Sequence, residues 1–101
     1  MPTDYLKIAR DIVLKHIDKT QYDVFLFGSR ACGNFHSRSD IDIGILGKQP
    51  LNMMVRLNIE EALEQSIVPF KVDVVDFANA SDTFKTEAFK EIVYWNKMES
   101  A

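Results

Sequence analysis

The segment from residue 28 to residue 42 holds residue types and spacings that could bind phosphates and a metal ion. Gly28 and Ser29 directly follow a run of four apolar residues, and after ten intervening residues Asp40 and Asp42 precede a second apolar run. A glycine at the end of a strand lets the backbone turn sharply and approach a ligand closely. Backbone N–H groups at the start of a helical turn bind anions. The Gly-Ser pair is therefore a candidate phosphate site, with the Ser29 hydroxyl as a further donor.

The two aspartates have the spacing of metal ligands. Side chains at alternate positions of a strand share one face, so Asp40 and Asp42 would lie close together and repel each other. A divalent cation removes that repulsion, and Mg²⁺ prefers carboxylate oxygens and completes its shell with water and substrate phosphates. An Asp-x-Asp pair also occurs on solvated strand edges. The neighbouring Gly-Ser turn favours a site for a nucleoside triphosphate with Mg²⁺.

A third acidic group is expected from the apolar run at residues 71–77, which contains Asp73 and Asp76 on opposite faces of a predicted strand. A carboxylate buried among valines without a partner is costly, so it must reach a metal, a basic group or water. Asp76 is close to the strand end, where water is accessible. We expect Asp73 to be the third carboxylate of the site, with Asp76 as the alternative.

The surrounding elements predict an α/β class, a small mixed β-sheet packed by helices, in a single domain over residues 1–101. Apolar residues at helical spacing predict helices, and short apolar or alternating runs predict strands. Pro50 is expected at the first position of its helix, and Thr3 and Ser81 are expected as N-caps. The expected elements are a helix over 4–17, a strand over 23–27, a loop with a helical turn over 28–39, a strand over 40–46, a helix over 50–66, a strand over 71–77 and a helix over 81–97.

Composition excludes several classes of protein. The chain has 101 residues, of which 47% are hydrophobic and 27% charged, as in soluble globular proteins. No apolar stretch approaches the ~20 residues of a membrane span. A net charge of −3 with scattered Lys and Arg makes nucleic acid an unlikely partner. The first residues lack the pattern of a signal peptide, and the single Cys32 cannot form an internal disulfide, so we expect a cytoplasmic protein.

The pattern of Gly28-Ser29, ten residues, then Asp40-Ile41-Asp42 resembles the signature of the polymerase-β-like nucleotidyltransferase superfamily. The strand with two aspartates that leads into the last helix is similar to that of the minimal nucleotidyltransferases, or MNT proteins. These proteins are commonly paired with a small helical HEPN-domain protein. The loop residues that also match the small members of the superfamily are Arg30, Gly33, Arg38 and Ser39.

The resemblance implies roles for individual residues. Asp40 and Asp42 would bind two Mg²⁺ ions, and Asp73 would complete the catalytic triad and help to deprotonate an attacking hydroxyl. Arg30 and Arg38 would neutralise charge on the phosphates, although both could also be solvated loop residues. The nucleotide-binding residues would be Gly28, Ser29, Arg30, Arg38 and Ser39.

The implied function is Mg²⁺-dependent transfer of AMP from ATP to a hydroxyl, with a tyrosine of a HEPN toxin as the acceptor and this chain as the antitoxin. One alternative is adenylylation of a small molecule, against which the lack of a second domain counts. The other alternative is a non-catalytic antitoxin or scaffold that binds its HEPN partner. The expected last helix carries more aromatic residues than one buried face needs, and the surplus could contact a partner or a second copy in a homodimer.

Overall fold

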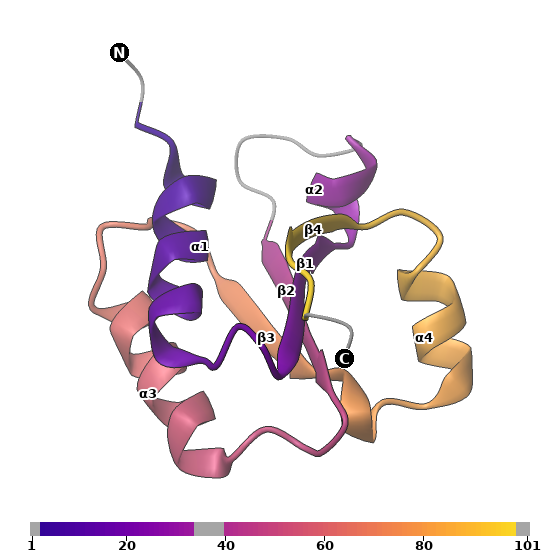
Figure 1. Ribbon diagram of the computed structural model, residues 1–101. Helices are drawn as coiled ribbons and strands as arrows, with labels where there is room; N and C mark the ends of the chain where they lie inside the picture. Colours follow the sequence, from indigo (N-terminus) through magenta and orange to yellow (C-terminus); the bar gives the residue numbers. More distant parts are fainter. Residues whose placement is uncertain (1–2, 34–39, 99–101) are drawn as a thin grey trace.

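The computed structural model describes residues 3–33 and 40–98, and over these ranges the chain forms a four-stranded sheet with the order β3-β2-β1-β4. Strand β1 is antiparallel to both β2 and β4, whereas β2 and β3 are parallel. The predicted mixed α/β sheet is confirmed. The elements, shown in Figure 1, are α1 (Tyr5–His16), β1 (Tyr22–Phe27), α2 (Ser29–Cys32), β2 (Ile41–Gly47), α3 (Met53–Glu64), β3 (Val72–Asp76), the 3-10 helix η1 (Phe77–Asn79), α4 (Asp82–Ala88) and β4 (Val93–Asn96).

The sheet separates two apolar layers. Helices α1 and α3 lie on one side of it and α4 on the other (Figure 1). The larger layer joins the isoleucines of β2 to buried residues of α1 and α3, such as Val13 and Ile59. The smaller layer is aromatic: Phe25, Phe27 and Phe77 pack there with Phe89. Because strand side chains alternate, every second residue of β2 faces this aromatic layer.

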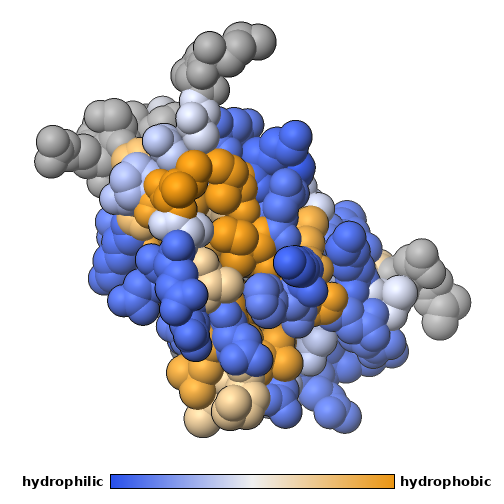
Figure 2. Space-filling view, turned by 90° about the vertical axis from the view of Figure 1, so that its left-hand side faces the viewer, coloured by the Kyte–Doolittle hydropathy of each residue, from blue (hydrophilic) through white to orange (hydrophobic). Residues whose placement is uncertain are grey.

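The outer surface of the larger layer is mixed. Figure 2, which views the molecule from the side of α1 and α3, shows apolar side chains among hydrophilic ones. On α3, Met53, Met54 and Leu57 are exposed. In the described ranges, no helix has both the length and the apolar character that a membrane span requires.

The predicted helix over residues 81–97 is wrong in its second half. Ser81 does cap α4, since its Oγ accepts a hydrogen bond from the Phe84 N–H at 3.1 Å, but the helix ends at Ala88. The chain then forms β4 along the open side of β1. Residues 92–95 are β-branched or aromatic and suit a strand. Ile92 packs in the aromatic layer whereas Trp95 packs against the larger layer, so the two side chains lie on opposite faces of the sheet and not on one face of a helix.

Two helix starts also differ from expectation. Asp4, not Thr3, caps α1: its Oδ1 accepts a hydrogen bond from the Lys7 N–H at 3.0 Å. Helix α3 begins at Met53, so Pro50 lies before it, and Asn52 is the cap. Asp and Asn are strong N-cap residues because their side-chain oxygens reach the free N–H groups of the first turn. The predicted strands hold to within one residue at each end.

Candidate active site

Asp42 and Asp73 lie side by side on neighbouring strands. They are partners in the parallel register of β2 and β3, and Asp42 is also the partner of Phe27 in the antiparallel register with β1. Residues paired in register project to the same face of a sheet. Both carboxylates therefore lie on the face of the aromatic layer, at the end of β2 where the strand begins, and Asp40 precedes this end and is exposed.

Negative charge is concentrated at this position. Burial raises the pKa of the Asp42 carboxyl above its usual value, and the carboxylates of Asp73 and Asp40 raise the pKa further. Lys71 acts in the opposite direction, since it lowers the pKa of Asp42, and its Nζ lies 3.8 Å from Oδ1 of Asp73. Among the described residues that act on the Asp42 pKa, the largely exposed Lys71 does not balance three carboxylates, so a bound cation would relieve the remaining repulsion.

The donor set fits a hard divalent cation by its chemistry, because all three side chains offer carboxylate oxygens. Within residues 3–33 and 40–98, however, no group of three His, Cys, Asp or Glu side chains is drawn together closely enough to hold a metal ion. The structure thus brings Asp42 and Asp73 together and places Asp40 within electrostatic range. The three carboxylates do not form a complete metal-binding site in this arrangement.

Gly28 brings the backbone against the Asp42 carboxylate. It lies between β1 and α2 with φ 76° and ψ −156°, a region that is open almost only to glycine. A Cβ at this position would collide with Oδ2 of Asp42 and lie 3.2 Å from its Cγ. The turn that the sequence predicts as a phosphate site therefore lies against Asp42, one of the predicted metal ligands.

Ser29 is the first residue of α2, where backbone N–H groups have no partner within the helix. The guanidinium of Arg30 lies over the ring of Phe70, with its central carbon 4.6 Å from the ring centroid. Phe70 comes from the segment before β3, and no pattern in the sequence connects it with α2. The remaining predicted nucleotide-binding residues, Arg38 and Ser39, lie outside the described residues.

Asp76 has a different environment from Asp73. It is on the opposite face of β3 and only 9% exposed. Its carboxylate accepts hydrogen bonds from the Leu51 N–H at 2.8 Å, the Ala78 N–H at 3.1 Å and the Asn79 side-chain amide at 3.4 Å. Asp76 therefore holds the start of η1 and the segment before α3 in place, and its acceptor positions point away from Asp42.

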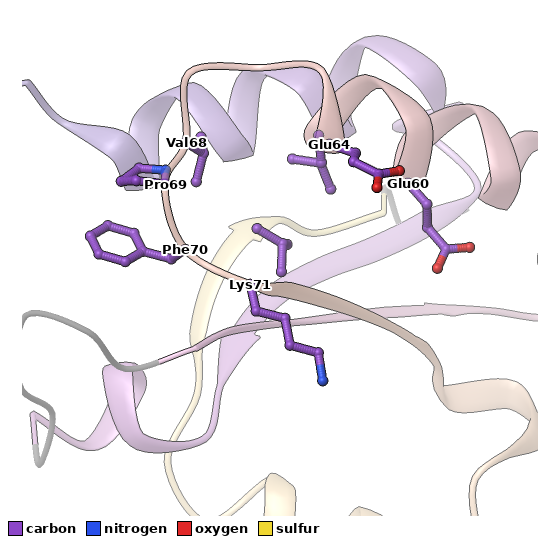
Figure 3. A pocket seen from close by; sticks show the side chains of 8 residues that line it. Glu60, Glu64, Val68, Pro69, Phe70 and Lys71 are labelled. Atoms are coloured by element: carbon purple, nitrogen blue, oxygen red, sulfur yellow. The ribbon is translucent and has the colours of Figure 1, made fainter.

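Two cavities lie near these residues. One, of about 430 Å³, lies between the end of α3 and the segment before β3 (Figure 3). It contains none of the three carboxylates, but Phe70 and Lys71 line it and also contact the site. The other cavity, of about 440 Å³, lies on the side of α4 and is lined by Gly28 and Phe84 among others. Strand registers and helix periods carry no signal for either cavity.

The chain is similar to known proteins in both sequence and fold. Residues 11–99 match the family model described as "Polymerase beta, Nucleotidyltransferase". The chain is 38% identical over 64 residues to the probable protein adenylyltransferase MntA of Haemophilus influenzae, covering 63% of this chain and 56% of that protein. It is 37% identical over 76 residues to the protein adenylyltransferase MntA of Shewanella oneidensis, covering 75% of this chain and 50% of that protein.

The chain therefore spans about half the length of the curated relatives that it matches. Among solved structures, it is similar to a crystal structure of a toxin–antitoxin with AMP-PNP. That match has a TM-score of 0.71 and 29% sequence identity, and it covers 94% of this chain and 75% of the other. Since the family model extends over most of the sequence and the sheet has the matching fold, the chain belongs to the polymerase beta nucleotidyltransferase family.

Proposed function

We propose that this chain is a Mg²⁺-dependent protein adenylyltransferase that transfers AMP from ATP to a hydroxyl group. The acceptor is a tyrosine of a HEPN-domain toxin, and the chain acts as the antitoxin in the cytoplasm. The observation that carries the proposal is the pairing of Asp42 with Asp73 across β2 and β3, with Gly28 against the Asp42 carboxylate. The adenylyltransferase names of the two curated relatives and the AMP-PNP complex of the structural neighbour support it.

The residues divide between binding and proton transfer. The backbone at Gly28 and Ser29 binds the β- and γ-phosphates, and Arg30 adds positive charge beside them. Asp40, Asp42 and Asp73 would hold the two Mg²⁺ ions, which when bound neutralise charge on the phosphates and on the reacting oxygens. The carboxylates thus determine where the α-phosphate lies relative to the sheet.

The reaction is an in-line displacement at the α-phosphorus. The acceptor oxygen forms a bond to this phosphorus while the bond from the phosphorus to the α,β-bridging oxygen breaks, and pyrophosphate leaves with that electron pair. The hydroxyl proton passes to the carboxylate of Asp73, which is 44% exposed and so can pass it on to water. Asp42 is more confined by Gly28 and is better suited to positioning.

Intact-mass spectrometry tests the proposal. The purified chain is incubated with ATP, Mg²⁺ and a candidate HEPN-domain partner protein, and Asp42→Asn serves as the control. We expect the partner to gain one or more AMP units of roughly 329 Da each, and the control to give no gain. A stable complex without any mass gain would favour the non-catalytic scaffold. Mass gain on an added small hydroxylated molecule, with none on the partner, would favour the small-molecule alternative.

A further inference from the structure

The cavity on the side of α4 continues the candidate active site. It opens beside Gly28 and is lined by Phe27, which is the register partner of Asp42. Paired residues share a face of the sheet, so the cavity and the Asp42 carboxylate lie on the same side. A ligand whose phosphates reach the turn at Gly28 therefore has this cavity next to it.

Two aromatic rings line this cavity. Phe27 and Phe84 both line it, with ring centroids 5.9 Å apart and ring planes at 82°. Phe84 is 42% exposed, yet its ring also packs against the buried Phe77 at a centroid distance of 5.5 Å. An aromatic side chain that is fixed from behind and open in front is suited to stack on a flat heterocycle, and such stacking tolerates any base.

Charged residues follow Phe84 along the wall. Glu87, Lys90 and Glu91 also line the cavity, and Lys90 Nζ lies 3.0 Å from Oε1 of Glu87. Two carboxylates against one ammonium repel a triphosphate, so the phosphates belong at the Gly28 end of this cavity, away from Glu87 and Glu91. The edge of a nucleobase presents both N–H donors and ring-nitrogen acceptors, which the carboxylates and the ammonium can satisfy.

The ring of an acceptor tyrosine fits this lining less well. Its hydroxyl, the one polar group that the ring has, must lie at the α-phosphorus for transfer. The charged lining residues Glu87, Lys90 and Glu91 would then have no polar atom of the ring to bind.

We propose that the cavity is the nucleobase subsite of the enzyme, with Phe84 as the residue that stacks on the base of a nucleoside triphosphate. This inference rests on the proposed function, because it takes the phosphates to lie at Gly28 and Ser29. It adds which part of the chain binds the base, and it assigns α4 a role in substrate binding.

Titration calorimetry in the presence of Mg²⁺ tests this subsite with two ligands, ATP and inorganic tripolyphosphate, which lacks the nucleoside. We expect Phe84→Ala to weaken ATP binding by about tenfold or more, the usual effect of removing one stacking ring, and to leave tripolyphosphate binding unchanged. Tyr94→Ala is the matched control, since Tyr94 is 43% exposed and packs on Phe25 outside the cavity. It should change neither affinity. Phe84→Leu repeats the test with more packing volume retained, in case the alanine variant does not fold.

The outcomes separate this proposal from the function on which it rests. If the wild type binds neither ligand, the proposed triphosphate site is wrong. If it binds both and the Phe84 variants weaken both equally, or weaken neither, the nucleobase subsite is wrong while the proposed function stands. Unchanged ATP affinity with loss of transfer to the partner would assign the cavity to the acceptor ring and would also overturn the nucleobase subsite.

Discussion

Asp42 and Asp73 are register partners across the parallel strands β2 and β3, although 30 residues separate them in the chain. Burial is the larger cause of the raised pKa of Asp42, and the repulsion between these two carboxylates raises it further. If the site had no function, a neutral side chain at either position would remove this repulsion and make the fold more stable. The pair therefore gives a measurable signature of the site even when no substrate is present.

The first prediction concerns stability and pH. The pKa of the Asp42 carboxyl is raised above 3.8 in the folded state. The folded state therefore binds the proton of this carboxyl more tightly than the unfolded state does. Protonation of Asp42 thus contributes to the free energy of unfolding. This contribution is complete below about pH 3.8 and is lost as the pH rises through the raised pKa of the folded state. In metal-free buffer, we expect Asp42→Asn to become more stable relative to the wild type as the pH rises through this range. Urea denaturation measures the free energy of unfolding of both proteins.

Added Mg²⁺ should raise the free energy of unfolding of the wild type and leave that of Asp42→Asn unchanged. This is the effect expected of a ligand that binds only the carboxylates of the folded state. Asp11→Asn on the exposed side of α1 is the control and should follow the wild type. A wild type that gains no stability from Mg²⁺ would contradict a metal site at Asp42.

The second prediction concerns the turn before α2. Gly28→Ala places a Cβ on the Asp42 carboxylate in a backbone region that disfavours side chains, so we expect a loss of about 3 kcal/mol in unfolding free energy. We also expect ATP binding to be lost. Gly33→Ala is the matched control: its φ of 78° is also positive, but a Cβ there meets no atom of the described residues within 4 Å. It should cost about 1 kcal/mol and retain ATP binding. Equal effects of the two substitutions would show that the collision with Asp42 is unimportant.

The sequence was sufficient to predict the centre of this site. Gly28 follows β1 and Asp42 lies in β2, so the pairing of these two strands, which are neighbours in the chain, is enough to set Gly28 against the Asp42 carboxylate. The alternation of side chains along β3 then placed Asp73 on one face and Asp76 on the other. The register of β2 with β3, which depends on the whole sheet, was needed to set Asp73 beside Asp42.

Other features depend on contacts that no local pattern encodes. Residues 92–95 fit a helical stripe and a strand equally well, and the open side of β1 decides for the strand β4. Phe70 and Phe84 reach the site from segments that lie well after the Asp-x-Asp motif, so only the packed fold shows that one lies under Arg30 and the other lines the cavity at Gly28.

The third prediction separates the two aspartates of β3. Asp73→Asn should reduce adenylyl transfer by on the order of 100-fold or more, since even outer-shell partners of metal ligands cost up to that much, and it should leave stability unchanged or raised. Asp76→Asn turns an acceptor of three hydrogen bonds into a partial donor. It should cost about 1–3 kcal/mol of stability and leave the transfer rate per folded molecule intact. Thermal denaturation and partner mass gain, measured on both variants, check this. The reverse pattern would make Asp76 the third carboxylate.

The fourth prediction concerns Phe70, which lies in the segment before β3. Its ring makes a cation–π contact with the Arg30 guanidinium. If Arg30 binds the triphosphate, Phe70→Leu should weaken ATP and tripolyphosphate binding alike, because loss of a cation–π contact of about 0.5–1 kcal/mol corresponds to about two- to fivefold in affinity. Tyr5→Leu is the control, since the Tyr5 ring packs edge-on against Phe70 at 5.7 Å without replacing its contact with Arg30. It should lower stability more than affinity. A selective loss of ATP binding in Phe70→Leu would instead mean that Phe70 acts on the nucleoside, and Arg30 would then lose its assigned role at the phosphates.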